Sequence, residues 1–152
     1  MAKTKSSKST KVVGGGGVER VNPPSAGPVF GMYSHVSIVE AGARVAYIAG
    51  QVSVDTKGQI VGPNDLAAQT PVVFGNLEGI LGDLGATFDD VIELRTYVVG
   101  RENLAAWFEA RTGVYKRIYP DGKYPPNTLV VVAGLNRAEL RLEISATVRL
   151  RG

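Results

Sequence analysis

The chain of 152 residues contains no cysteine and a single histidine, His35. Without cysteine it has no disulfide framework, no thiolate nucleophile and no thiolate-ligated metal site. One histidine cannot build a histidine-based metal cluster, and any Ser-His-Asp triad would depend on His35 alone. His35 follows Tyr33 and Ser34 in a predicted strand, where a structural or surface role is the better interpretation. We therefore expect no metal site, and the lack of cysteine agrees with a cytoplasmic protein.

A basic surplus is also missing from most of the chain. The formal net charge is +3, but four of the 17 Lys and Arg residues are Lys3, Lys5, Lys8 and Lys11. The remaining 13 face 14 acidic residues, so the body of the chain is close to neutral. A neutral body without a stripe of basic and aromatic residues argues against a nucleic-acid partner and against RNA cleavage.

Long apolar runs are absent as well, and none approaches the ~20 residues of a membrane-spanning helix. We therefore expect no membrane partner. Residues 1–17 are rich in Lys, Ser and Thr and end in four consecutive glycines. This composition predicts a flexible tail without a secretion signal, and an electrostatic arm for nucleic acid is the alternative. Residues 18–152 form one predicted domain, because this length is sufficient for a single hydrophobic core.

Residues 47–85 contain the clearest local signals. A run of strand-forming residues ends near Gly50, and turn-forming residues follow at 55–58. Asp65 then stands at the N-cap position of a predicted helix, and Gly85 stands where a glycine would end it. Between them lies an apolar stripe with helical spacing. The stripe consists of Leu66, Val73, Leu77, Ile80, Leu81 and Leu84.

The other segments alternate between strand and helix patterns. Strands are predicted at 33–39, 45–51, 91–99, 128–132 and 141–150, and residues 18–31 are predicted to be irregular because they hold three prolines. The run at 128–132 is apolar on both faces, which indicates a strand buried on both sides. Asn103 is predicted to cap a second helix. Its apolar face consists of Leu104, Trp107, Phe108, Val114, Tyr115 and Ile118. The order predicts an α+β fold in which two helices cover one face of a mixed six-stranded sheet.

Four short fragments occur in a fixed order within this pattern. They are AGQ at 49–51, DxxG at 55–58, AAQT at 67–70 and NLxxILxxLG at 76–85. In order and spacing they resemble the RidA (YjgF) family, and the resemblance covers residues 33–150. It implies a chorismate-mutase-like fold, a homotrimer, and small-molecule clefts between subunits. Several members of the family hydrolyse reactive 2-imino acids to 2-keto acids and ammonia without a cofactor.

The resemblance also implies a catalytic carboxylate. Glu143 matches the strand glutamate that the family's deaminases place near the ligand, where a carboxylate can act as a general base on water. The alternative is a cross-strand ion pair with Arg95 or Arg141. Tyr33 matches a tyrosine that lines the cleft, and the alternative is a partly buried packing residue.

The cleft wall contains the remaining candidate binding residues and two departures from the family pattern. Gly50 matches the family glycine, but Ala49 stands before it where active members often have serine. Asn127 stands where imine-deaminating members carry an arginine that binds the substrate carboxylate. An amide lacks the charge and the fork of a guanidinium, so we expect about ten- to a hundredfold weaker carboxylate binding. Two functions follow as alternatives: an enamine or imine deaminase of altered specificity, or a non-catalytic ligand-binding or regulatory module.

Overall fold

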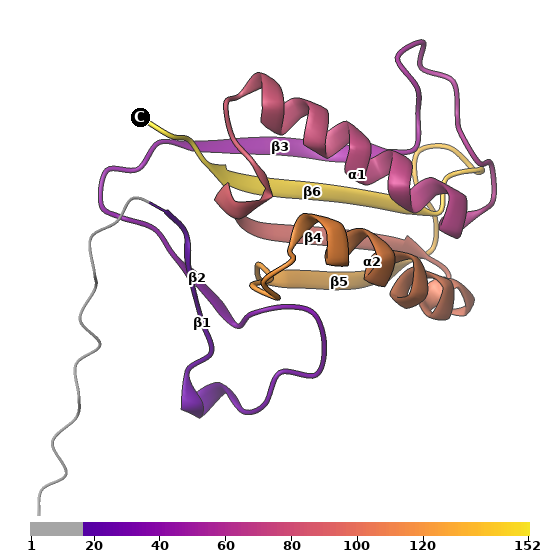
Figure 1. Ribbon diagram of the computed structural model, residues 1–152. Helices are drawn as coiled ribbons and strands as arrows, with labels where there is room; N and C mark the ends of the chain where they lie inside the picture. Colours follow the sequence, from indigo (N-terminus) through magenta and orange to yellow (C-terminus); the bar gives the residue numbers. More distant parts are fainter. Residues whose placement is uncertain (1–16) are drawn as a thin grey trace, which may run out of the picture.

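The computed structural model describes residues 17–152, so the predicted tail lies outside the described residues except for Gly17. The predicted α+β class is confirmed. Helices α1 (Leu66–Asp83) and α2 (Leu104–Ile118) pack side by side on one face of a mixed four-stranded sheet (Figure 1). The sheet order is β3-β6-β4-β5, where β5 is parallel to β4 and the other pairs are antiparallel. The four strands are β3 (Val45–Val52), β6 (Leu142–Arg149), β4 (Val91–Val99) and β5 (Asn127–Val132).

The structure contains six strands in its described part, but they do not form one sheet. β1 (Glu19–Val21) and β2 (Val36–Ile38) pair with each other in a separate antiparallel ribbon beside the main sheet (Figure 1). β1 lies in the region predicted to be irregular, and β2 is shorter than the predicted strand at 33–39. Proline lacks a backbone N–H, so the prolines between these strands keep most of the segment out of a ladder. Three short 3₁₀ helices connect other elements: η1 (Pro24–Ala26), η2 (Phe88–Asp90) and η3 (Arg101–Asn103).

Helix α1 forms where its sequence signals predict it. The Asp65 side chain accepts a hydrogen bond from the Ala68 N–H at 3.0 Å, which satisfies one of the unpaired amides of the first turn. Gly85, just after the helix, has a φ of +66° that favours glycine. The buried face of α1 rests on β3 and β6. Within residues 17–152, no helix is both long enough and apolar enough to span a membrane.

Helix α2 differs from its prediction at two positions. The Asn103 side chain does not cap the helix and instead donates to the Val99 carbonyl oxygen at 2.7 Å. Phe108, predicted on the apolar face, is 45% exposed, because it lies about 100° around the helix from the fully buried Trp107. Arg111 occupies the buried face in its place, one turn from Trp107 and one turn from Tyr115.

The prediction that β5 is buried on both sides is wrong for the single chain. β5 pairs only with β4 and forms an edge of the sheet, so Val130 and Val131 are 41% and 38% exposed. β6 is one of the two interior strands, with β4, and its predicted alternation is confirmed. Its apolar side chains lie beneath the helices and form the core with those of β4 and both helices.

Candidate functional site

The sheet face opposite the helices, here called the open face, contains Glu143. Glu143 lies on β6 between the buried Leu142 and Ile144, so the alternation of a strand directs its side chain to the open face. Across the sheet, the ladder between β3 and β6 is interrupted between Ile48 and Gln51. This bulge contains two of the predicted cleft residues, Ala49 and Gly50.

Gly50 leaves the space that the Glu143 carboxylate occupies. A Cβ atom on Gly50 would lie 1.9 Å from Glu143 Oε1 and 2.5 Å from its Cδ, well inside any contact distance. The carboxylate therefore lies directly against the backbone of the bulge. Ala49, exposed and adjacent, presents a methyl group to the same face. The structure thus brings Ala49, Gly50 and Glu143 together in one place.

Neither arginine considered as a partner of Glu143 pairs with it. Arg95 forms its ion pair with Glu93, and Glu93 also accepts a hydrogen bond from Thr147 at 3.2 Å. Arg141 donates to backbone carbonyls of its own loop and to the Asn64 side chain. Among residues 17–152, Glu143 makes no ion pair and no side-chain hydrogen bond. Its carboxylate is therefore free to bind water or a ligand.

Asn127 lies on the helix-covered face of the sheet, opposite Glu143. Its Oδ1 accepts a hydrogen bond from Oγ1 of the fully buried Thr96 at 3.0 Å. The Asn127 amide is also close to the hydroxyl of Tyr115. Burial raises the pKa of the Tyr115 phenol, and the nearby Arg111 guanidinium and Asn127 amide offset this only in part. Within one chain, Asn127 and Glu143 therefore cannot line the same cleft.

Tyr33 is half-buried in the loop before β2. Its ring is perpendicular to that of His35 at a centroid distance of 5.6 Å, and its hydroxyl accepts a hydrogen bond from the Phe30 N–H at 3.5 Å. The next residue, Ser34, donates its N–H to the Pro125 carbonyl oxygen at 3.4 Å, close to the start of β5. The loop that carries Tyr33 is therefore attached near the start of β5, where Asn127 lies.

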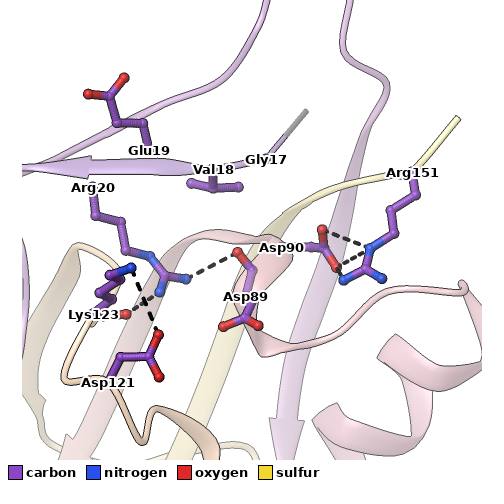
Figure 2. A pocket seen from close by; sticks show the side chains of 9 residues that line it. All are labelled: Gly17, Val18, Glu19, Arg20, Asp89, Asp90, Asp121, Lys123 and Arg151. Atoms are coloured by element: carbon purple, nitrogen blue, oxygen red, sulfur yellow. Dashed lines mark hydrogen bonds and ion pairs between the residues drawn. The ribbon is translucent and has the colours of Figure 1, made fainter. Parts of the chain in front are cut away.

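A pocket of about 650 Å³ lies elsewhere, between β1, η2 and the last residues of the chain (Figure 2). Two ion pairs join charged side chains of its lining: Arg151 pairs with Asp90 at 2.7 Å, and Lys123 pairs with Asp121 at 3.8 Å. Arg20 donates to backbone carbonyls of η2, β4 and the loop after α2. These bonds attach the β1–β2 ribbon to the main domain, so we interpret this charged pocket as a structural contact between the two and not as a binding site.

Arg111 is a buried charged residue that the sequence analysis did not identify as a functional candidate. It is 9% exposed, and its guanidinium lies over the rings of Trp107, Phe108 and Tyr115. The sequence indicates its burial only through its position, since Arg111 lies four residues from Trp107 and four residues from Tyr115 on the apolar face of the helix.

Comparison with known proteins identifies the family. The family model described as Endoribonuclease L-PSP matches residues 25–150. YyfB of Yersinia pestis, a Rid-family protein of unknown function, is 38% identical with a TM-score of 0.76, over 88% of this chain and 99% of that chain. A RutC family protein of Pyrococcus abyssi is 30% identical over 101 residues, which are 66% of this chain and 74% of that protein. Escherichia coli TdcF, solved with bound serine, has the same fold at 24% identity and a TM-score of 0.62, over 75% of this chain and 85% of that chain. The match across residues 25–150 and the likeness to Rid proteins confirm the resemblance, and the chain belongs to the YjgF/RidA family.

Proposed function

We propose that this protein hydrolyses the C=N bond of a small imine, or of the imine tautomer of an enamine, with a specificity different from that of relatives that carry arginine at the position of Asn127. The observation that carries the proposal is the free Glu143 carboxylate, held against Gly50 on the open face. A carboxylate without an ion-pair partner can accept a proton from water, whereas one paired with arginine is a weaker base.

The proposed reaction needs one water molecule and no oxidant. Glu143 takes a proton from the water as its oxygen attacks the imine carbon, and the C=N π electrons pass to nitrogen, which takes that proton from Glu143. The resulting carbinolamine then loses ammonia: Glu143 accepts the hydroxyl proton and passes it to the leaving nitrogen as the C–N bond breaks and the C=O bond forms. The products are a carbonyl compound and ammonia, and Glu143 returns to its starting charge.

We further propose that the active assembly is a homotrimer with its clefts between copies. Glu143 and Asn127 lie on opposite faces of one sheet, so a cleft containing both requires two chains. Apolar side chains that a second copy could cover lie on the open face and at the β5 edge, where Tyr47 is 81% and Val130 41% exposed. Light scattering should give about 48 kDa, three times the 16.1 kDa of the chain. A monomer at micromolar concentration would contradict the assembly and the shared cleft.

Two observations bear on the ligand class. The serine bound to TdcF is a small amino acid, which supports a ligand of similar size here. RNA cleavage, which the family description names, is not favoured, because the body of this chain holds 13 basic and 14 acidic residues.

The test is ammonia release from imines generated in situ by an amino-acid oxidase. Glu143→Gln should lower turnover by about 10²- to 10⁴-fold, the usual contribution of a general base. The matched control is Glu93→Gln, which removes a carboxylate of the same face that is already paired with Arg95. Equal losses in both variants, or full activity in Glu143→Gln, would contradict the assigned role. Saturable ligand binding without turnover in the wild type would instead support the ligand-binding module.

A further inference from the structure

Arg111 is a buried cation without an anionic partner. Its guanidinium carbon lies 5.9 Å from the Trp107 ring centroid, 5.1 Å from that of Phe108 and 5.4 Å from that of Tyr115. Among the described residues it makes no ion pair or hydrogen bond, and its Nε is buried without a partner. Arg149 shows the usual arrangement at the same degree of burial, because it pairs with both Glu40 and Asp90.

The aromatic contacts do not compensate for the burial of this charge. A cation–π contact contributes roughly 0.5–2 kcal/mol, while removing a charged group from water costs several kcal/mol. Desolvation lowers the pKa of Arg111, which agrees with the lack of a neighbouring carboxylate, although a guanidinium remains protonated at neutral pH. Arg111 is therefore a site of positive charge that an anion would stabilise.

The end of the Arg111 side chain is its more accessible part. Of the guanidinium nitrogens only Nε is fully buried without a partner, so the terminal nitrogens retain some contact with solvent. Nη2 lies 4.0 Å from where a Cβ atom on Gly31 would stand, and Gly31 is exposed. Gly31 precedes Tyr33 by two residues, which places this end of the side chain next to a predicted cleft residue.

Arg111 and Asn127 both lie near Tyr115. Tyr115 contacts both, since its ring lies beneath the Arg111 guanidinium and its hydroxyl is close to the Asn127 amide. We infer that Arg111, on α2, is the carboxylate-binding residue of this protein, and that its ligands are small carboxylates held by the guanidinium fork. A single guanidinium matches the single negative charge of a carboxylate. The link to turnover rests on the proposed function, but binding can be tested without it.

The binding experiment uses the full chain and its only tryptophan. Trp107 lies beneath the Arg111 guanidinium, so its fluorescence should change saturably on titration with 2-oxobutanoate, a stable keto acid. The uncharged 2-butanone should have no such effect, and inorganic phosphate should bind more weakly. Calorimetry gives a second dissociation constant that does not depend on the fluorophore. Equal effects from butanone, or tighter binding of phosphate than of 2-oxobutanoate, would overturn the carboxylate assignment.

Arg111→Gln should weaken 2-oxobutanoate binding about tenfold or more, the loss expected for a charged hydrogen bond, and Arg111→Lys should weaken it less. The control is Arg117→Gln, on the same helix but exposed and paired with Glu78, which should leave the affinity unchanged. An unchanged affinity in Arg111→Gln would overturn the inference. If that variant does not fold, the ¹⁵Nε–¹H signal of Arg111 in the wild type decides. The chemical shift of this signal should change when 2-oxobutanoate is added. An unchanged chemical shift would mean that Arg111 does not bind the carboxylate.

The inference and the proposed function fail in different ways. Glu93→Gln, which removes the open-face carboxylate that is paired with Arg95, should keep the wild-type affinity for 2-oxobutanoate. Carboxylate binding that depends on Arg111 in a protein without turnover would support the inference and refute the hydrolase. Turnover with the same KM in wild type and Arg111→Gln would refute the inference and leave the hydrolase in place.

Discussion

Replacing Gly50 with alanine should displace the Glu143 carboxylate without unfolding the protein. The added Cβ atom would lie 1.9 Å from Oε1, whereas real Cβ atoms do not approach other atoms within 3.0 Å. The difference requires the carboxylate to move by about 1.1 Å. The atoms in the way belong to the end of a flexible side chain, so the backbone can stay in place. Gly50 is not among the positive-φ glycines, so alanine can adopt its conformation.

The effect on activity should far exceed the effect on stability. A misplacement of about 1 Å in a reacting group costs about a hundredfold in rate, which corresponds to ~2.7 kcal/mol in activation free energy. The new rotamer of Glu143 costs about 0.5–1.5 kcal/mol, and the lower entropy of the unfolded alanine chain offsets about 0.4–1 kcal/mol of this. We therefore expect a free energy of unfolding within about 1 kcal/mol of wild type.

The assay is ammonia release from imines, measured together with urea unfolding. Gly75→Ala provides the control, because a Cβ atom there, on an exposed turn of α1, meets nothing within 4 Å. It should leave turnover unchanged. Wild-type turnover in Gly50→Ala would refute the reasoning, since the Glu143 carboxylate could then move without consequence. A collapse of stability would show that the bulge itself, and not the carboxylate, needs glycine.

Three further predictions concern stability. Gln69→Leu should lower the free energy of unfolding in urea by about 3 kcal/mol or more, because it leaves the carbonyls of Gly62 and Glu139 and the N–H of Arg141 without buried partners; a loss below 1 kcal/mol would contradict this. Gly75→Ala should raise the free energy of unfolding by about 0.5–1 kcal/mol through helix propensity, seen as a higher urea midpoint. Burial favours neutral Asp90, but hydrogen bonds from Arg151 and Thr87 outweigh it and hold the pKa of Asp90 below its usual value. A lowered folded-state pKa stabilises the fold above the unfolded-state pKa, and this contribution is lost as the pH falls from about 4 through the folded-state pKa. Urea midpoints measured between pH 2 and 6 should therefore fall less in Arg151→Gln than in wild type, and equal falls would count against the pairing.

The sequence by itself determined the elements whose causes are local. The Asp65 cap, the stripe of α1 and Gly85 lie within a few turns of one another, so the helix follows from short-range spacing alone. The alternation of β6 likewise identified its buried face, because side chains of a strand must alternate. The same alternation directed Glu143 away from the core, and the ordered fragments gave the family.

Only the tertiary structure decided which segments meet. Apolar residues on both faces of β5 predict burial, but exposure depends on whether a second strand pairs with β5, and none does in the described chain. The fit of Glu143 into the space at Gly50 joins residues 93 positions apart, and no periodicity within either strand encodes it. Asn127 and Glu143 fall on opposite faces because β5 and β6 flank β4 in a particular register, which long-range pairing fixes. The burial of Arg111 against three aromatic rings has the same origin, since a helix pattern shows which residues share a face but not whether a charge on that face finds a partner.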